Sequence, residues 1–212
     1  MANGKLIIVR HGESEWNARG VWTGSTDVHL SKKGFKEAEL LGEKMTDIHF
    51  DEAFCSQQIR ALETLEGILD ASKQYDVPYE RSSALNERDY GDFTGKNKWQ
   101  VQQEVGDSEF QRIRRGWDHP VANGETLRAV FERVVPFYDF KILPELKKHK
   151  NVLVVAHGNS IRALIKYIED ISDAGIEKTE MIFGDILIYE VNENGKQIKK
   201  SVRKIDTTPP PA

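Results

Sequence analysis

Two histidine–glycine pairs are the residues best suited to chemistry in this sequence. His11-Gly12 comes after the apolar run Leu6–Val9 and Arg10, and His157-Gly158 comes after the similar run Val152–Ala156. A histidine can be a nucleophile, a base or a metal ligand, or it can only hydrogen-bond the backbone where a helix begins. Because the same element occurs twice and Arg10 adjoins one copy, we expect both histidines to face one pocket.

The charges around these histidines indicate an anion rather than a metal. Arg10 directly precedes His11, and the sequence lacks the H-E-x-x-H and Cys/His spacings of metal sites. Arg60 is expected in the first turns of a helix, where free backbone amides favour an anion. Any one of these cations alone is more often a solvated surface charge, but guanidinium groups match phosphate and carboxylate geometry. Further cations are Lys98, Arg114 and Arg115, and amides or small polar groups would come from Gly12, Asn17, Thr23 and Gly24.

Glu87 is the carboxylate that we single out, in the irregular stretch Leu85–Gly91. It could belong to a surface turn with Arg88, or it could be the general acid and base that phosphoryl transfer between hydroxyl groups requires. The nearby segment Gly91–Asn97 is similar to a phosphate-binding loop, but its glycines are one residue too close. Asn97 also replaces the Ser or Thr that binds magnesium in such loops, so we exclude nucleotide hydrolysis.

Three apolar runs must deliver these residues, over 6–9, 53–55 and 152–156. Such continuous runs are typical of strands that are buried on both faces. Because each run leads toward a helical pattern, the sequence predicts an α/β fold with a mainly parallel sheet flanked by helices on both faces. Ligands of open α/β sheets bind at the carboxyl ends of the strands, where His11 and His157 are expected.

The helices and a terminal hairpin carry signals of their own. Ser31 could cap the first long helix, a later helix should start near Gly124-Glu125, and prolines should bend or divide that later helix. A hairpin is expected with its turn at Asn194-Gly195. On the first long helix, one apolar face toward the core is expected to hold Phe35, Ala38, Leu41 and Met45. The helical pattern after Ser56 runs through Ile59, Ala61, Leu62, Leu65 and Leu69. The prolines are Pro136 and Pro144, and the strands of the hairpin are Ile186–Tyr189 and Gln197–Lys200.

The composition is that of a globular protein, with 212 residues of which 39% are hydrophobic and 30% are charged. We expect one catalytic domain over 1–205, with an insertion over the active site at about 82–124 and a disordered tail over 206–212. The net charge of −4 argues against nucleic-acid binding, and no apolar run approaches the ~18 residues of a membrane span. The single cysteine, Cys55, and the lack of a secretory signal predict a cytoplasmic protein.

From about Lys5 to Lys166 the sequence resembles the cofactor-dependent phosphoglycerate mutases of the histidine phosphatase superfamily. The R-H-G element alone indicates only the superfamily, whereas L-N-E-R-x-Y-G with its G-x-N-K continuation is typical of the mutases. The segments that carry the resemblance are Arg10–Asn17, Leu85–Gly91 with Gly95–Lys98, Arg114–Gly116 and Ala156–Ser160.

The resemblance implies a three-layer sandwich that interconverts 2-phosphoglycerate and 3-phosphoglycerate in glycolysis and gluconeogenesis. His11 would become a phosphohistidine, primed by 2,3-bisphosphoglycerate without a metal, and Glu87 would move the hydroxyl proton. Arg10, Arg60 and His157 would spread the charge of the phosphoryl group. The substrate would be held by Tyr90, Lys98, Arg114 and Arg115, and its cradle completed by Ser14, Asn17, Thr23, Gly24, Gly158 and Asn159. The partners would be small-molecule phosphoglycerates, and the protein could be a monomer or a homo-oligomer.

Three departures from the family pattern bear on this interpretation. Ser25 stands where the family usually has tryptophan, and the stretch between Gly116 and Glu125 is short, as in the compact members. The run Phe183–Ile186 does not match the usual T-G-x-P, which leaves open how the C-terminal region closes the pocket. The alternative functions are a broad-specificity acid phosphatase of the same superfamily, an enzyme that mainly synthesises bisphosphoglycerate, and a phosphoglycerate- or phosphopeptide-binding protein without turnover.

Overall fold

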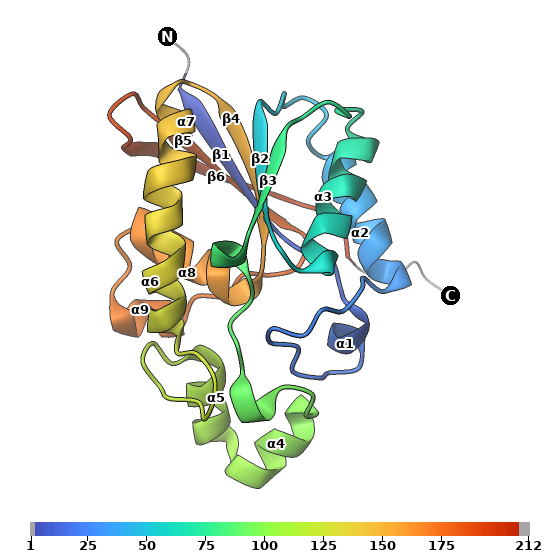
Figure 1. Ribbon diagram of the computed structural model, residues 1–212, viewed down its shortest axis with the longest axis vertical. Coiled ribbons are helices and arrows are strands. Elements are labelled where there is room, and N and C mark those ends of the chain that lie inside the picture. The colour runs from blue at the N-terminus through green and yellow to red at the C-terminus, as the bar shows by residue number, and fades with distance from the viewer. Residues whose placement is uncertain (1–2, 208–212) are drawn as a thin grey trace.

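The computed structural model describes residues 3–207 and contains one six-stranded sheet (Figure 1). The strand order is β3-β2-β4-β1-β5-β6. The first four strands in that order run parallel, β5 is antiparallel to β1, and β6 is antiparallel to β5. The predicted α/β fold with a mainly parallel sheet is therefore confirmed. The strands are β1 (Gly4–Arg10), β2 (Glu52–Ser56), β3 (Tyr79–Ser82), β4 (Asn151–Ala156), β5 (Asp185–Val191) and β6 (Gln197–Lys204).

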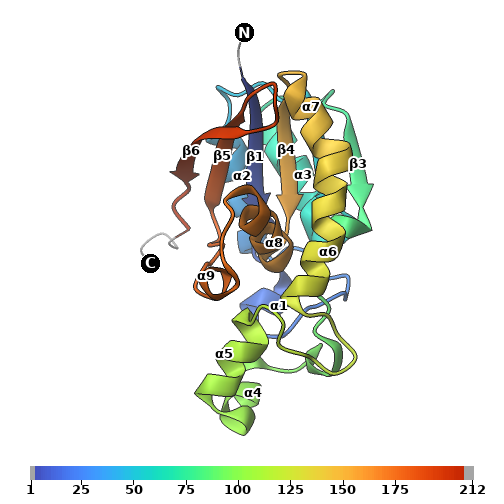
Figure 2. The same ribbon diagram turned by 90° about the vertical axis from the view of Figure 1, so that its left-hand side faces the viewer.

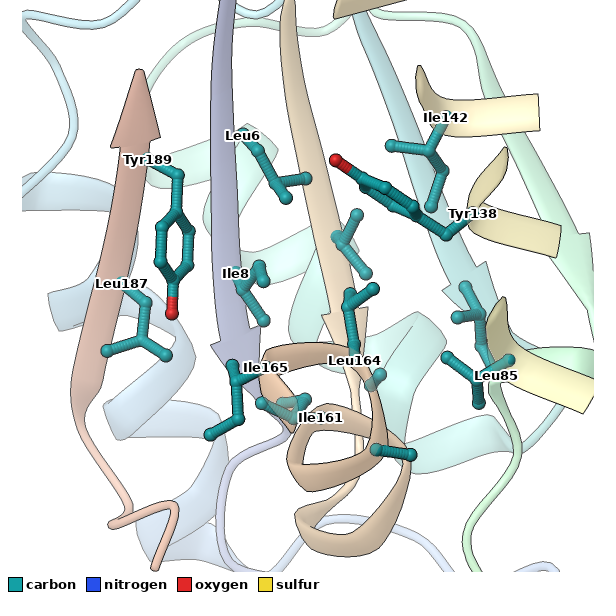
Figure 3. Packing of buried hydrophobic residues seen from close by; sticks show 14 of the residues in the cluster. Leu6, Ile8, Leu85, Tyr138, Ile142, Ile161, Leu164, Ile165, Leu187 and Tyr189 are labelled. Carbon is teal, nitrogen blue, oxygen red and sulfur yellow. The ribbon is translucent and has the colours of Figure 1, made fainter. Parts of the chain in front are cut away.

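Helices cover both faces of the sheet, as Figures 1 and 2 show. Side chains alternate along a strand, so Leu6 and Ile8 of β1 pack on one face while Ile7 and Val9 pack on the other. Figure 3 shows the first face, where Leu6 and Ile8 lie near residues of α8 and β5. One face carries α2 (Lys32–Glu43) and α3 (Ile59–Ala71), and the other carries α6 (Leu127–Phe137), the π-helical segment Tyr138–Ile142, α7 (Leu143–Lys147) and α8 (Gly158–Ile168).

Helix α2 is capped by Ser31, whose hydroxyl accepts from the Gly34 amide at 3.1 Å, as predicted. The prediction that Phe35 faces the core is wrong, because this residue is 50% exposed. A Cβ atom on Gly34 would lie 2.0 Å from the Glu13 carbonyl oxygen. The loop after β1 therefore packs directly on α2, and this contact turns the next residue, Phe35, toward solvent. Ala38, Leu41 and Met45 are buried as expected.

The predicted division of the later helix is confirmed. Thr126 caps α6, which starts at Leu127, within three residues of the predicted position. Pro136 lies inside α6 and has no amide hydrogen to donate, and the chain continues through the π-helical segment into α7, where Pro144 occupies the first turn. The β5–β6 hairpin is also confirmed, and Gly195 adopts a φ of +82° in its turn.

The region 83–124 lies beyond the carboxyl ends of the parallel strands (Figures 1 and 2). It packs around a small apolar cluster of its own, to which Trp22 contributes from the loop after β1. Its elements are the 3₁₀ turns Ser83–Leu85 and Gly91–Phe93, α4 (Lys98–Val105) and α5 (Asp107–Arg115), and the chain also forms α1 (Glu15–Ala18) and α9 (Asp173–Glu177). The division into a domain over 1–205 and a tail stays a prediction, and residues 208–212 of that tail lie outside the described residues.

None of the helices within residues 3–207 combines the length and apolar character that crossing a bilayer would require.

Candidate active site

Three neighbouring strands bring Ser56, His157 and His11 together. In the sheet β4 lies between β2 and β1, and Arg10 pairs with Ala156, so the two histidines that follow leave the sheet at the same level. The His11 and His157 rings have centroids 4.8 Å apart at an interplanar angle of 55°. Ser56, the last residue of β2, places its Oγ 2.7 Å from His157 Nε2. The two histidines therefore meet at the carboxyl edge of the sheet, as predicted. The expectation that both face one pocket is met by His11 alone, since His157 is not in the lining of the pocket described below.

His11 is held in one tautomer. Its Nδ1 lies 2.6 Å from the Gly12 carbonyl oxygen. Because a carbonyl oxygen can only accept, Nδ1 carries the hydrogen and the lone pair of the neutral ring is on Nε2. Burial, followed by the charges of Arg60 and Arg10, holds the pKa of His11 well below its usual value. The ring is therefore neutral at pH 7, as a nucleophilic imidazole must be.

His157 is completely buried behind this nucleophile candidate. Ser56 Oγ accepts from the Gln58 amide at 3.2 Å, which leaves its own hydrogen for His157 Nε2. Within residues 3–207 the other ring nitrogen, Nδ1, has no hydrogen-bond partner. Burial and the nearby charge of Arg60 hold the pKa of His157 well below its usual value. A neutral ring that accepts at Nε2 would carry its hydrogen on Nδ1.

A pocket of about 290 Å³ lies at this edge of the sheet and has His11 in its lining. The predicted site residues that line it are Arg10, His11, Asn17, Thr23, Gly24, Arg60, Glu87, Tyr90, Lys98, Arg114, Arg115, Gly158 and Asn159. Three predicted residues, Gly12, Ser14 and His157, are not in the lining. The Gly12 amide, expected to face the anion, instead donates to Thr64 Oγ1 at 3.0 Å. Ser14 is fully buried and caps α1, where its Oγ accepts from the Asn17 amide at 3.2 Å and donates to Asn17 Oδ1 at 2.9 Å.

The pocket is strongly cationic. Burial lowers the pKa of Arg10, that of Arg60 to about 10 and that of Lys98 to about 8. Two arginines of α5, Arg114 and Arg115, line the same space. Since bringing these positive charges together in a buried site is costly, the arrangement favours an anionic ligand that offsets the repulsion.

Several buried donors around the pocket have no acceptor within residues 3–207. Buried polar groups in proteins are normally hydrogen-bonded, so a group of unpaired donors indicates the place of a ligand with several acceptor atoms. A phosphate fits this requirement because its oxygens accept hydrogen bonds in several directions. The unpaired atoms of pocket-lining residues are Arg10 Nε, Trp22 Nε1, Thr23 Oγ1, Arg60 Nε and Arg162 Nε.

Glu87 presents its carboxylate to this pocket on a firmly held segment of backbone. Its Oε1 accepts from the Asn159 amide at 3.2 Å, from Asn159 Nδ2 at 3.0 Å and from the Arg88 amide at 2.8 Å. Its own amide donates to Gln58 Oε1 at 2.8 Å, and its carbonyl accepts from Arg133 Nη2 at 3.2 Å. Fixed in this way, the carboxylate could exchange a proton with a ligand in the pocket.

Arg60 organises the loop that follows α1. Its Nη1 donates to the Thr26 carbonyl at 3.0 Å and its Nη2 donates to the Gly24 carbonyl at 3.2 Å. Gln58 Nε2 donates to the same Gly24 oxygen at 2.9 Å, and Gly24 adopts a φ of +51°, which favours glycine. Ser25, the residue that departs from the family pattern, is bonded through Oγ to Asp89 Oδ2 at 3.1 Å.

The sequence reasoning missed three contributors to the pocket, namely Trp22, Arg162 and the segment Glu180–Phe183. Arg162 could have been found, because it lies three residues after Asn159 on α8 and therefore on the same helix face. Trp22 gave no signal apart from its size. The segment Glu180–Phe183 lies in the region where the family motif is not matched, so its place in the pocket was not predictable.

Within residues 3–207, no three His, Cys, Asp or Glu side chains are grouped as a metal site would need.

Comparisons with known proteins place the chain in a family. Residues 6–203 match the histidine phosphatase superfamily (branch 1). A 2,3-bisphosphoglycerate-dependent phosphoglycerate mutase of Cytophaga hutchinsonii is 41% identical over 204 residues, which cover 96% of this chain and 95% of the relative. The enzyme of the same name from Buchnera aphidicola is 39% identical and covers 94% of this chain and 98% of its own. That alignment spans 226 positions although this chain has 212 residues, so the relative contains extra residues within the matched region.

The chain therefore belongs to branch 1 of the histidine phosphatase superfamily and, within it, to the family of 2,3-bisphosphoglycerate-dependent phosphoglycerate mutases. A mycobacterial glucosyl-3-phosphoglycerate phosphatase has the same fold, with a TM-score of 0.80 at 19% identity, and the match covers 96% of this chain and 98% of the other. Because a phosphatase shares the architecture, the fold alone does not decide between phosphoryl transfer to a hydroxyl group and transfer to water.

Proposed function

We propose that this protein interconverts 2-phosphoglycerate and 3-phosphoglycerate through a phosphohistidine at His11, primed by 2,3-bisphosphoglycerate. The observation that carries the proposal is the buried, neutral His11, whose Nδ1 donates to the Gly12 carbonyl and whose Nε2 keeps the lone pair in a cation-lined pocket. The family membership and the presence of Glu87 in the same pocket support it. The unpaired buried donors fit an anionic ligand such as a phosphoglycerate or 2,3-bisphosphoglycerate.

In the proposed reaction, His11 Nε2 attacks phosphorus and forms a P–N bond while the bond from phosphorus to the ligand oxygen breaks. Arg10 and Arg60 spread the negative charge of the phosphoryl group, since positioning and electrostatics provide most of the catalysis in such transfers. His157 would assist through the hydrogen on Nδ1, because Ser56 occupies its Nε2. The second half-reaction reverses these steps with the other hydroxyl group of the glycerate as acceptor.

Glu87 would give its proton to the departing hydroxyl oxygen and take a proton from the attacking one. Asn159 holds that carboxylate through two hydrogen bonds, which orients it for both steps. The carboxylate and second phosphate of the ligand would be held by Tyr90, Lys98, Arg114 and Arg115. The cradle would be completed by Asn17, Thr23, Gly24, Gly158 and Asn159, with Ser14 acting through the hydrogen bonds that position Asn17.

The test is an enolase-coupled assay with 3-phosphoglycerate, with and without 2,3-bisphosphoglycerate. We expect turnover that depends on the bisphosphate, and an acid-labile, base-stable phosphoryl label on His11 after incubation with it. His11→Asn is the matched control and should take no label. Label at His157 or at a serine would contradict the assignment. Release of inorganic phosphate from many phosphate esters, without formation of 2-phosphoglycerate, would favour the broad-specificity phosphatase instead.

The proposed setting is glycolysis and gluconeogenesis in the cytoplasm, with small-molecule phosphoglycerates as partners and no metal in the reaction. Cationic side chains line the pocket and would offset the charge of a bound phosphate, the role that a metal would otherwise take. Extensive chelation should therefore leave the mutase rate unchanged. Restoration of a lost rate by manganese would point to a different catalytic design.

A further inference from the structure

The segment between α9 and β5 forms one wall of the active-site pocket. Glu180, Met181, Ile182 and Phe183 all line the space that contains His11. The Met181 carbonyl accepts from Arg10 Nη1 at 3.0 Å, and the Arg10 guanidinium carbon lies 3.7 Å from the centroid of the Phe183 ring. The segment therefore contacts a cation to which we assign a role in the reaction.

Glu180 links the same segment to a second arginine of the pocket. Its carboxylate forms an ion pair with Nη2 of Arg115. Glu180 and Glu87 are the two carboxylates in the pocket lining, and the proposed mechanism uses only Glu87. The proposed mechanism therefore gives Glu180 no role, although it lines the pocket. Its side chain is 58% exposed and that of Arg115 is 20% exposed.

The two adjacent arginines of α5 differ as a result. The guanidinium of Arg114 lies 5.3 Å from the Phe110 ring centroid, and within residues 3–207 it has no ion pair or hydrogen bond. The side chain of Arg115 is already paired with a carboxylate. An anion that enters the pocket meets Arg114 as a free cation, whereas at Arg115 it competes with Glu180 for the Nη2 group.

We infer that Glu180 is a specificity-determining residue, which holds Arg115 until a carboxylate or phosphate at the far end of the ligand displaces it. A partly exposed ion pair contributes little to stability, so an anionic group of the bound ligand can replace Glu180 on Arg115. A ligand with one anionic group, bound near His11, leaves the pair intact. The inference rests on the proposed function in one respect, namely that the reacting phosphate binds near His11 and the second anion near α5.

The inference predicts opposite results for two matched ligands. In 4-phosphonobutyrate a phosphonate and a carboxylate are joined by three methylene groups, and butylphosphonate has a methyl group in place of that carboxylate. Neither ligand can transfer its phosphorus group, because the P–C bond is not cleaved by this chemistry. Calorimetric titration of the wild type and of Glu180→Gln with both ligands therefore measures binding without turnover.

Glu180→Gln should bind 4-phosphonobutyrate about threefold to fivefold more tightly than the wild type, the range expected when a partly exposed ion pair no longer has to be broken. Its affinity for butylphosphonate should change by less than about twofold, since that ligand does not reach Arg115. In an Arg115→Gln background the effect of Glu180→Gln on 4-phosphonobutyrate should disappear, because the cation that both groups share is gone.

Glu177→Gln is the matched control. It removes the same charge from nearby α9, but Glu177 accepts from the Trp117 amide and is not in the pocket lining. It should leave both affinities unchanged. Equal tightening of both ligands in Glu180→Gln, or tightening in Glu177→Gln, would show a general effect of net charge. Weaker binding of 4-phosphonobutyrate to Glu180→Gln would show that Glu180 holds Arg115 in its binding position, and either result overturns the inference.

The same experiment separates this inference from the proposed function. If the wild type binds 4-phosphonobutyrate and Glu180→Gln binds it equally well, the inference about Glu180 is wrong and the mutase proposal stands. If the wild type fails in the enolase-coupled assay, the mutase proposal is wrong, whatever the titrations show about Glu180.

Discussion

Asn159 donates to the Glu87 carboxylate from two atoms at once, with its backbone nitrogen 3.2 Å and its Nδ2 3.0 Å from Oε1. The side-chain amide is held in this orientation by Arg162, whose Nη1 donates to Asn159 Oδ1 at 2.9 Å. A rotated amide would turn its oxygen toward the carboxylate and its nitrogen toward the guanidinium, so both contacts would be lost. Arg162 is therefore a positioning residue that acts on Glu87 through Asn159.

Arg162→Lys should lower kcat more than it changes KM. A lysine can reach only part of the acceptor set of Arg162, which is Asn159 Oδ1 and the carbonyls of Arg115 and Ile176. Loss of precise placement of a catalytic group reduces the rate by about 10- to 100-fold. The enolase-coupled assay measures this, and Arg128→Lys, in an exposed arginine paired with Asp118, is the control. A lower melting temperature with an unchanged kcat would mean that Arg162 serves only the fold.

Glu87→Gln should reduce the mutase rate by about 10²–10⁴, the usual contribution of general acid–base catalysis. A glutamine oxygen can still accept from Asn159 and from the Arg88 amide, so the fold and the affinity for 3-phosphoglycerate should be nearly normal. The measurement is kcat in the coupled assay, together with the affinity for 3-phosphoglycerate by titration.

The control for Glu87→Gln is a substrate that needs no proton on its leaving group. Phosphorylation of His11 by p-nitrophenyl phosphate should be much less affected than phosphorylation by 2,3-bisphosphoglycerate, because p-nitrophenolate departs readily as an anion. A mutase rate within about threefold of the wild type, a small fraction of the usual contribution, would assign Glu87 a purely structural role.

The pKa of Lys98 gives a pH dependence with a defined sign. Burial and the charges of Arg10 and Arg114 lower this pKa to about 8. The ammonium group is therefore present below pH 8 and is lost as the pH rises through that value. Because kcat/KM reports ionisations of the free enzyme, kcat/KM for 3-phosphoglycerate should fall above about pH 8. The loss should reach about 10-fold or more, as expected for a hydrogen bond to a charged group.

Lys98→Arg is the matched variant for this prediction. A guanidinium remains charged throughout the range from pH 6 to pH 9.5, so the fall above about pH 8 should be absent from its kcat/KM profile. Lys98→Met should show a low and nearly constant value over the same range. If the wild-type fall persists in Lys98→Arg, another group titrates and Lys98 does not hold the ligand anion.

Much of the site at the carboxyl edge of the sheet could be predicted from the sequence, because the site residues directly follow the strand residues along the chain. The apolar runs before His11 and His157 define buried parallel strands, and parallel strands end at the same edge of a sheet. The position of Arg60 at the start of α3 followed in the same way from the helical period after Ser56. In each of these cases a local pattern determines the geometry.

The remainder depends on contacts between distant segments, which no local pattern encodes. Phe35 is exposed because the loop at Glu13 packs on Gly34, which fixes the rotation of α2 about its axis. Glu180 and Phe183 reach the pocket because the segment before β5 crosses over Arg10 and Arg115, in a region where the sequence lacks the family motif. Such contacts are set by tertiary packing, so sequence spacing alone could not have placed them.

Arg114 and Arg115 together should separate the mutase reaction from simple phosphate ester hydrolysis. Replacing both with alanine removes several charge-assisted hydrogen bonds, each worth about 1.5–3 kcal/mol. Mutase kcat/KM should therefore fall by about 10³ or more, since each 1.4 kcal/mol is a factor of ten. Hydrolysis of a small aryl phosphate should fall much less, because that substrate has no second anion. Arg112→Ala, in an exposed arginine of the same helix, is the control. If both activities fall equally in the double variant, the two arginines act on the reacting phosphate or the fold, and the assignment of the second anion to α5 is wrong.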